Sequence, residues 1–222
     1  MPAQRVGKNA VAIGRFDVVG QDATGSPEFV GHVALALEGT TIYRATGPLP
    51  VVHMRPPLEH AGQCHAHCIG SVGLTADEEQ QIAVFSDEIQ SEYLAAQVNT
   101  RNQYVISPHV KEVRSDDGTV VCYRFSCAGF VIEAYHEAGI DVLTFADEDL
   151  PPVSLDALKT QYPRLAGLLD SDRMREELGI PGDGPWRVVL AGHVMNALDR
   201  PESAIRSLRY SPQPGDEFFP RR

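Results

Sequence analysis

Two residues that could together form a nucleophilic site stand far apart in this chain. They are Cys127, in FSCAGFVIEAYHEAGI, and His32, at the start of HVALAL. From residue 125 the apolar residues recur at helical spacing, which predicts a helix with Cys127 in its first turn. Amides at a helix N-terminus stabilise negative charge, so they favour a thiolate and can hold an oxyanion. Ala128 and Gly129 are small enough for a carbonyl to approach, and Ser126 fits the N-cap.

A thiol nucleophile needs a proton carrier, and a histidine on a rigid strand provides one. His32 opens an apolar strand and is the best-placed candidate, so we predict hydrogen-bond-like proximity between the Cys127 sulfur and a His32 ring nitrogen. The competing interpretation is a small buried cysteine and a hydrogen-bonded histidine at a strand edge.

Both segments resemble parts of a known family. GHVALALEGTTIYRATG resembles the histidine-bearing hairpin of NlpC-like papain-fold proteins, and FSCAGFVIEAYHEAGI resembles their nucleophile helix. The histidine here precedes the cysteine, an order that resembles the circularly permuted branch with lecithin:retinol acyltransferase-like proteins. VGLTADEEQQIAVFSDEIQSEY resembles the helix that this branch places between the two. The resemblance implies a permuted papain-like α+β fold, an antiparallel sheet packed against helices including the nucleophile helix.

We expect a single domain over residues 1–222. The resemblance covers about residues 9–145 and leaves the role of the extension at 146–222 open.

The family pattern also implies a third polar residue, usually His or Glu, that orients the imidazole from the second hairpin strand. By spacing that position is Arg44, beside Tyr43, and an arginine cannot accept the imidazole N–H. Either His53, Glu38 or Thr41 replaces it, with His53 as the first choice, or the site is weakened. The candidate oxyanion and substrate-binding residues are Ser126, Ala128, Tyr43 and Arg44.

The surrounding pattern predicts the elements that would position the site. Thr75 and Glu78 form a capping box before a helix at 76–97. Residues 31–39 and 40–47 read as an antiparallel hairpin, and 21–29 as a turn-rich link. Further expected elements are strands within 9–20, at 50–55 and at 120–125, a turn at 115–119, helices at 154–160 and 163–178, and a poorly ordered Pro-rich tail.

Composition narrows the class of protein. The net charge of −11 makes nucleic acid an unsuitable partner. No stretch has the roughly 18 consecutive apolar residues of a membrane helix, and the N-terminus lacks a secretion signal, so we expect a cytoplasmic protein without stable membrane insertion. The four cysteines are therefore expected to be reduced thiols, with Cys122 buried in a strand.

Cys64, His65, His67 and Cys68 could ligate zinc, with His60 or His109 as distant partners. Their spacing differs from that of common zinc sites, so we expect an ordinary loop here and no metal or cofactor.

The expected function is a cysteine-dependent hydrolase, an amidase or peptidase of thiol-protease type, acting on a peptide or acylated small molecule through an acyl-thioester on Cys127. An acyltransferase of the same fold is the alternative. A non-catalytic binding module with a degenerate site and a metal enzyme centred on residues 60–68 are hypotheses of other classes.

Overall fold

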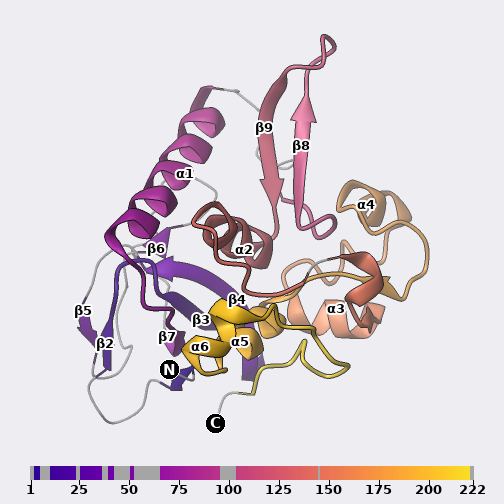
Figure 1. The fold of residues 1–222 in the computed structure, drawn as a ribbon. Helices are drawn as coiled ribbons and strands as arrows, with labels where there is room; N and C mark the ends of the chain where they lie inside the picture. The colour runs from indigo at the N-terminus through magenta and orange to yellow at the C-terminus, as the bar shows by residue number, and fades with distance from the viewer. Residues whose placement is uncertain are drawn as a thin grey trace.

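The apolar segments of the N-terminal half form a five-stranded antiparallel sheet in the order β1-β7-β3-β4-β6 (Figure 1). The computed structural model describes residues 3–5, 11–23, 26–36, 40–42, 51–52, 66–95, 104–144 and 146–220. The strands of this sheet are β1 (Gln4–Arg5), β3 (Val18–Ala23), β4 (Ser26–Ala36), β6 (Val51–Val52) and β7 (Ala66–Gly70).

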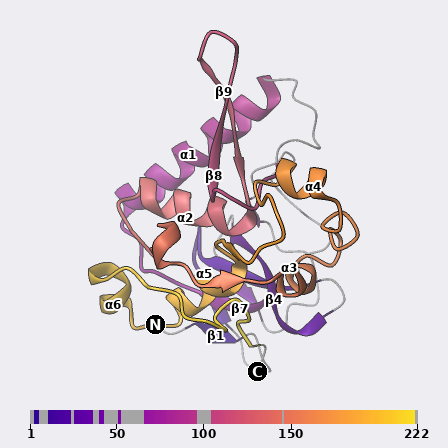
Figure 2. The ribbon, with the colours of Figure 1, turned by 90° about the vertical axis from the view of Figure 1, so that its right-hand side faces the viewer.

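The other strands form three antiparallel pairs. These are β2 (Val11–Ile13) with β5 (Thr40–Ile42), β8 (Val110–Arg114) with β9 (Val120–Phe125), and β10 (Pro152–Val153) with β11 (Trp186–Arg187). The β8–β9 hairpin turns at the predicted residues 115–119, and Figure 2 shows it projecting away from the rest of the molecule.

Six α-helices complete the described part of the chain, which is therefore mixed α+β as predicted. They are α1 (Ala76–Ala95), α2 (Cys127–Glu137), α3 (Leu155–Gln161), α4 (Asp172–Glu177), α5 (Ala191–Leu198) and α6 (Glu202–Ser207). A short 3-10 helix spans Asp147–Asp149. Within these described ranges, no helix combines the length and the apolar character needed to cross a bilayer.

The ends of α1 and α2 follow local sequence signals. At α1, Thr75 and Glu78 exchange hydrogen bonds of 2.8 and 3.3 Å, which confirms the predicted capping box. At α2, Ser126 is the N-cap, and Gly139 follows the helix with φ of +74°. Glycine adopts this left-handed conformation without a steric penalty, so it ends the helix.

The predicted hairpin between residues 31–39 and 40–47 is wrong. β4 pairs with β3 along most of its length and with β6 at Leu35 and Ala36, whereas β5 pairs with β2. The supposed link at 21–29 is also largely strand, because β3 runs to Ala23 and β4 begins at Ser26. Local composition predicts which segments are extended, but contacts between distant residues determine which strands pair.

One hydrophobic core joins the sheet to helices from the middle and the end of the chain. Val18, Val33 and Leu35 of the sheet are buried with residues of α1, α2 and α5. The approach of α5 is close: a Cβ at Gly70 would lie 2.7 Å from the Leu198 side chain. The final third of the chain is thus part of the packing around β4.

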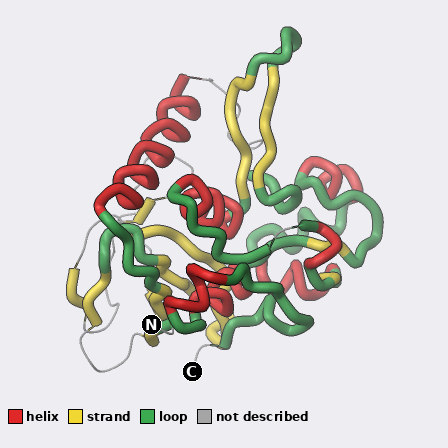
Figure 3. The backbone as a smooth tube through the Cα atoms, viewed as in Figure 1, coloured by secondary structure: helices red, strands yellow, loops and turns green. Residues whose placement is uncertain are grey.

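The C-terminal third differs from its predicted pattern in two places. The helix expected at 163–178 is a loop followed by α4, as Figure 3 shows, whereas α3 lies where it was expected. The tail, expected to be poorly ordered, is packed: Phe219 is buried and its carbonyl accepts a hydrogen bond of 3.1 Å from the Val30 N–H. Packing against β4 orders a segment whose prolines prevent regular structure.

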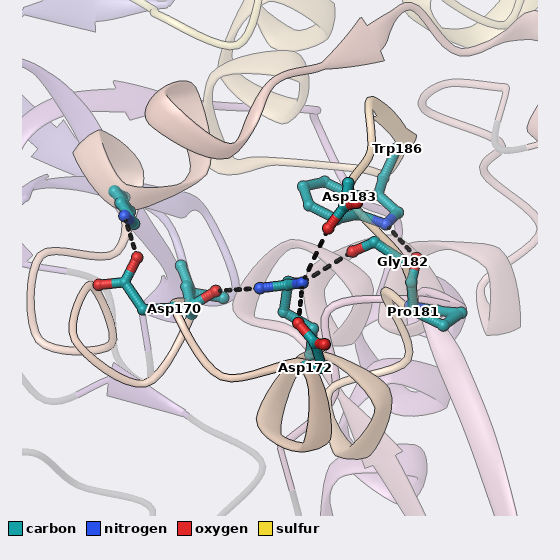
Figure 4. A network of polar contacts seen from close by, with 9 residues as sticks. Asp170, Asp172, Pro181, Gly182, Asp183 and Trp186 are labelled. Carbon is teal, nitrogen blue, oxygen red and sulfur yellow. Dashed lines mark hydrogen bonds and ion pairs between the residues drawn. The ribbon is translucent and has the colours of Figure 1, made fainter.

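A buried arginine holds the loops around α4 together (Figure 4). Arg175 donates to the carbonyls of Leu169 at 3.0 Å and Gly182 at 2.8 Å. Its guanidinium also contacts the carboxylates of Asp172 and Asp183. Five donors in a planar fork can serve several acceptors at once, so one side chain joins the loops on both sides of α4 to the first turn of that helix.

His193 of α5 is buried as a neutral imidazole. Its Nδ1 accepts a 3.2 Å hydrogen bond from the Leu190 N–H, so Nε2 carries the proton, and that nitrogen has no partner among the described residues. Burial lowers the pKa of His193 to about 4 from its ordinary 6.5. One ring nitrogen of this core histidine is therefore satisfied by a described residue and the other is not.

This depressed pKa predicts that stability falls in mild acid. The unfolded chain takes up a proton at His193 below about pH 6.5 and the folded chain resists it, so the contribution is full above that pH and is lost toward pH 4. We expect about 2 kcal/mol less unfolding free energy at pH 5 than at pH 7 from this group. Urea unfolding of the wild type and of His193→Gln at both pH values isolates the contribution of His193, because the other titratable groups are common to the two proteins. Parallel pH dependences would contradict the prediction.

Candidate active site

The first turn of α2 is built by a buried cap. Ser126 is fully buried, and its Oγ accepts a hydrogen bond of 2.9 Å from the Gly129 N–H. This confirms its predicted role as N-cap. Ala128 is also fully buried. Both residues shape the turn that presents Cys127.

Gly129 lets another main-chain segment lie against this turn. A Cβ at position 129 would overlap the carbonyl oxygen of His109 and lie 2.8 Å from its carbonyl carbon. No other residue type permits that approach. The His109 side chain lies 3.6 Å from the carboxylate of Glu133, one turn after Gly129 on α2.

Cys127 combines an electrostatically favourable position with strong burial. Only 6% of the surface of Cys127 is exposed. Main-chain N–H groups of Val33, Ala128 and Cys127 itself lower the pKa of the thiol, but burial is the larger effect and raises it above its ordinary value. The expected amides are thus in place, while the expectation that they alone favour the thiolate is wrong, because desolvation outweighs them. The resting group is a protonated thiol.

The contact with Val33 places Cys127 beside the main chain of β4. Ala36 exchanges hydrogen bonds of 2.7 and 2.8 Å with the segment that leads into β3. Main-chain groups alternate in direction along a strand, so the Val33 N–H points to the opposite edge of β4. Among the described residues, β6 pairs on that side with Leu35 and Ala36, and Pro220 of the tail bridges Phe29. The Cys127 thiol lies on the same side of β4, at Val33.

His32 is the residue immediately before Val33. It lies on β4 opposite Gln21 and is half-buried. The structure therefore brings the thiol to the main chain that carries His32. Side chains alternate between the faces of a strand, and Val33 is in the core shared with α2, so the imidazole begins on the other face.

Two tyrosines that were not among the predicted site residues lie beside Cys127. Tyr104 forms a bridge with Phe125, and its ring centroid is 6.1 Å from that of Tyr162, edge to face. The Cys127 N–H interacts with the Tyr104 hydroxyl, and the Cys127 sulfur acts electrostatically on both phenols. Burial raises the pKa of both, so the hydroxyls are neutral donors and acceptors. No motif marks either residue in the sequence.

The other predicted site residues have varied outcomes. His53, Tyr43, Arg44 and Glu38 lie outside the described residues. Thr41 lies on β5 opposite Ala12, in the separate β2–β5 pair.

The cysteine-rich segment is only partly described. Cys64, His60 and His65 lie outside the described residues, and Cys68 is buried in the core, where its Sγ faces Gly20. The described ranges contain no group of three or more His, Cys, Asp or Glu side chains that could hold a metal ion. Cys122 is buried in β9 as predicted, and it, Cys68 and Cys127 are thiols rather than half-cystines.

Fold and site together define a mixed α+β protein with a buried thiol at a helix N-terminus, against strand β4 of an antiparallel sheet. No family model, curated protein or solved structure matches the chain. The function must therefore be argued from the site.

Proposed function

We propose that this protein is a cysteine-dependent hydrolase, an amidase or peptidase, that forms an acyl-thioester on Cys127 with His32 as its base. The observation that carries this proposal is the hydrogen bond between the Val33 amide and the Cys127 thiol. It joins the helix N-terminus to the residue next to His32. The resemblance of both segments to permuted papain-like proteins supports the same pairing, and the fold we propose is of that type.

The raised pKa of Cys127 selects one form of the mechanism. Because the resting group is a thiol, His32 acts as a general base and removes the proton as the sulfur attacks the carbonyl carbon. The π electrons move to the carbonyl oxygen. When the carbonyl re-forms, the amine leaves with its bonding electrons and takes the proton from the imidazolium. Water, deprotonated by His32, then cleaves the thioester.

The proposed substrate is a peptide-type amide or an acylated small molecule. An acyltransferase would form the same acyl-thioester and differ only in the acceptor. A non-catalytic binding module is the second candidate, and the burial of Cys127 favours it, since a nucleophile must reach its substrate.

A single-turnover acylation tests the proposal. The full chain is mixed with p-nitrophenyl acetate near neutral pH, and release of nitrophenolate is followed while peptide mass spectrometry locates the acetyl group. We expect a rapid first turnover with acetyl on Cys127, loss of that phase in Cys127→Ala, and retention in the matched control Cys122→Ala, which removes another buried thiol. Slow acetylation, equal on Cys122 and Cys127, would favour the binding module.

A further inference from the structure

The Tyr162 hydroxyl is a buried donor beside Cys127 that makes no hydrogen bond to a described residue. Tyr162 is the C-cap of α3, in the third of the chain that the sequence resemblance does not cover. Its N–H is used by the Leu158 carbonyl at 2.8 Å, so the main chain of this residue is fixed. Only the phenol O–H is available.

An unpaired buried hydroxyl is costly. Leaving a buried polar group unsatisfied costs about 1–3 kcal/mol, and most such groups in folded proteins have partners. The Tyr104 hydroxyl is close enough to lower the pKa of Tyr162 as a hydrogen-bond donor does, but no hydrogen bond of normal geometry joins the two, and the O–H of Tyr162 is not used by a described residue. A vacant donor in this position is explained if a ligand completes it.

The main-chain N–H of Cys127, a second donor beside the thiol, already has a partner. The Cys127 N–H, which the family pattern assigns to the oxyanion, interacts with the Tyr104 hydroxyl oxygen. Tyr104 is held there because it bridges Phe125, two residues before Cys127. An oxyanion formed at Cys127 therefore needs a further donor, and the ring of Tyr162 lies against that of Tyr104 at 6.1 Å.

We propose that the Tyr162 hydroxyl donates a hydrogen bond to the oxyanion that forms when the Cys127 sulfur attacks a carbonyl. This inference rests on the proposed function. The sulfur–carbon bond forms, the carbonyl π electrons become the oxyanion lone pair, and Tyr162 keeps its proton throughout. The proton of the thiol goes to His32. Preorganised donors of this kind stabilise charge that appears only in the transition state.

Two reactions of the same thiol separate this role from a structural one. Acylation by p-nitrophenyl acetate passes through an oxyanion, whereas alkylation by iodoacetamide is a direct displacement without one. In the full chain with Tyr162→Phe, we expect acylation of Cys127 to slow roughly 100-fold, the usual effect of losing one oxyanion donor. Alkylation should stay within about twofold of the wild-type rate.

Tyr210→Phe is the matched control, because it removes another part-buried hydroxyl, bonded to Asp216, from the same third of the chain. It should change neither rate. Equal slowing of both reactions in Tyr162→Phe, or slowing of neither, would overturn the inference while leaving the proposed function standing. A wild-type Cys127 that is alkylated but never acylated overturns the proposed function, and the role of Tyr162 with it.

Discussion

Replacing His32 with alanine is expected to slow the acylation of Cys127 by roughly 100- to 10,000-fold, the range contributed by a general base. The effect should be large because burial raises the pKa of Cys127 and leaves a protonated thiol in the resting site. Without this base, the thiol must ionise by itself before it can attack.

The pH dependence distinguishes this loss from simple misfolding. In the wild type the acylation rate should rise with pH as the His32 imidazole becomes able to accept the thiol proton. In His32→Ala the rise should move to alkaline pH, because the thiol must ionise by itself and its pKa is raised. Added imidazole should restore part of the rate at neutral pH.

His136→Ala is the matched control for this variant, since His136 is an exposed histidine on α2 that pairs with Asp141 at 2.7 Å. It should acylate like the wild type. Equal rates in His32→Ala and the wild type would show that the contact at Val33 brings the strand, but not the imidazole, to the thiol.

The second large effect is on stability: Gly129→Ala should lower the free energy of unfolding by about 3 kcal/mol, as expected for severe overpacking. The sign is informative, because alanine in a helix interior normally gains up to about 1 kcal/mol over glycine. Here the new Cβ would meet the main chain of His109, which cannot rotate away as a side chain can. Either α2 or the segment at 104–109 must shift.

Urea unfolding at neutral pH measures this loss as a lower midpoint. Gly167→Ala is the matched control, because a Cβ there meets nothing within 4 Å. It should unfold within about 0.5 kcal/mol of the wild type. A Gly129→Ala protein as stable as Gly167→Ala would show that the segment at His109 does not rest on α2 as described.

His32→Ala and Gly129→Ala both affect the small region around Cys127. Gly129 allows the segment at 104–109 to lie on α2, and that segment carries Tyr104 to Cys127. A shift large enough to accept a Cβ would therefore disturb the donors around the thiol. Any Gly129→Ala protein that still folds should also acylate more slowly than the wild type.

Local signals in the sequence were sufficient for the helices next to the site. The capping box at Thr75 and Glu78, the N-cap at Ser126 and the glycine at 139 act within one or two turns, so the chain specifies them without distant partners. The burial of Cys122 follows equally from its place in an apolar strand.

Other features depended on contacts that no local pattern records. Strand pairing is one: β4 and β5 lie three residues apart in the chain, yet they belong to different sheets. The position of Tyr162 is another, because it reaches Cys127 only through the packing of α3 near Tyr104.

Hydrophobic period and capping are local properties, and they were sufficient to predict an α+β chain with Cys127 at the start of a helix. The contact of the thiol with the Val33 amide and its protonated state arise only when distant segments pack around it. Both depend on which atoms surround the sulfur, and desolvation is the sum of all those contacts. Such a sum exists only after distant segments have packed.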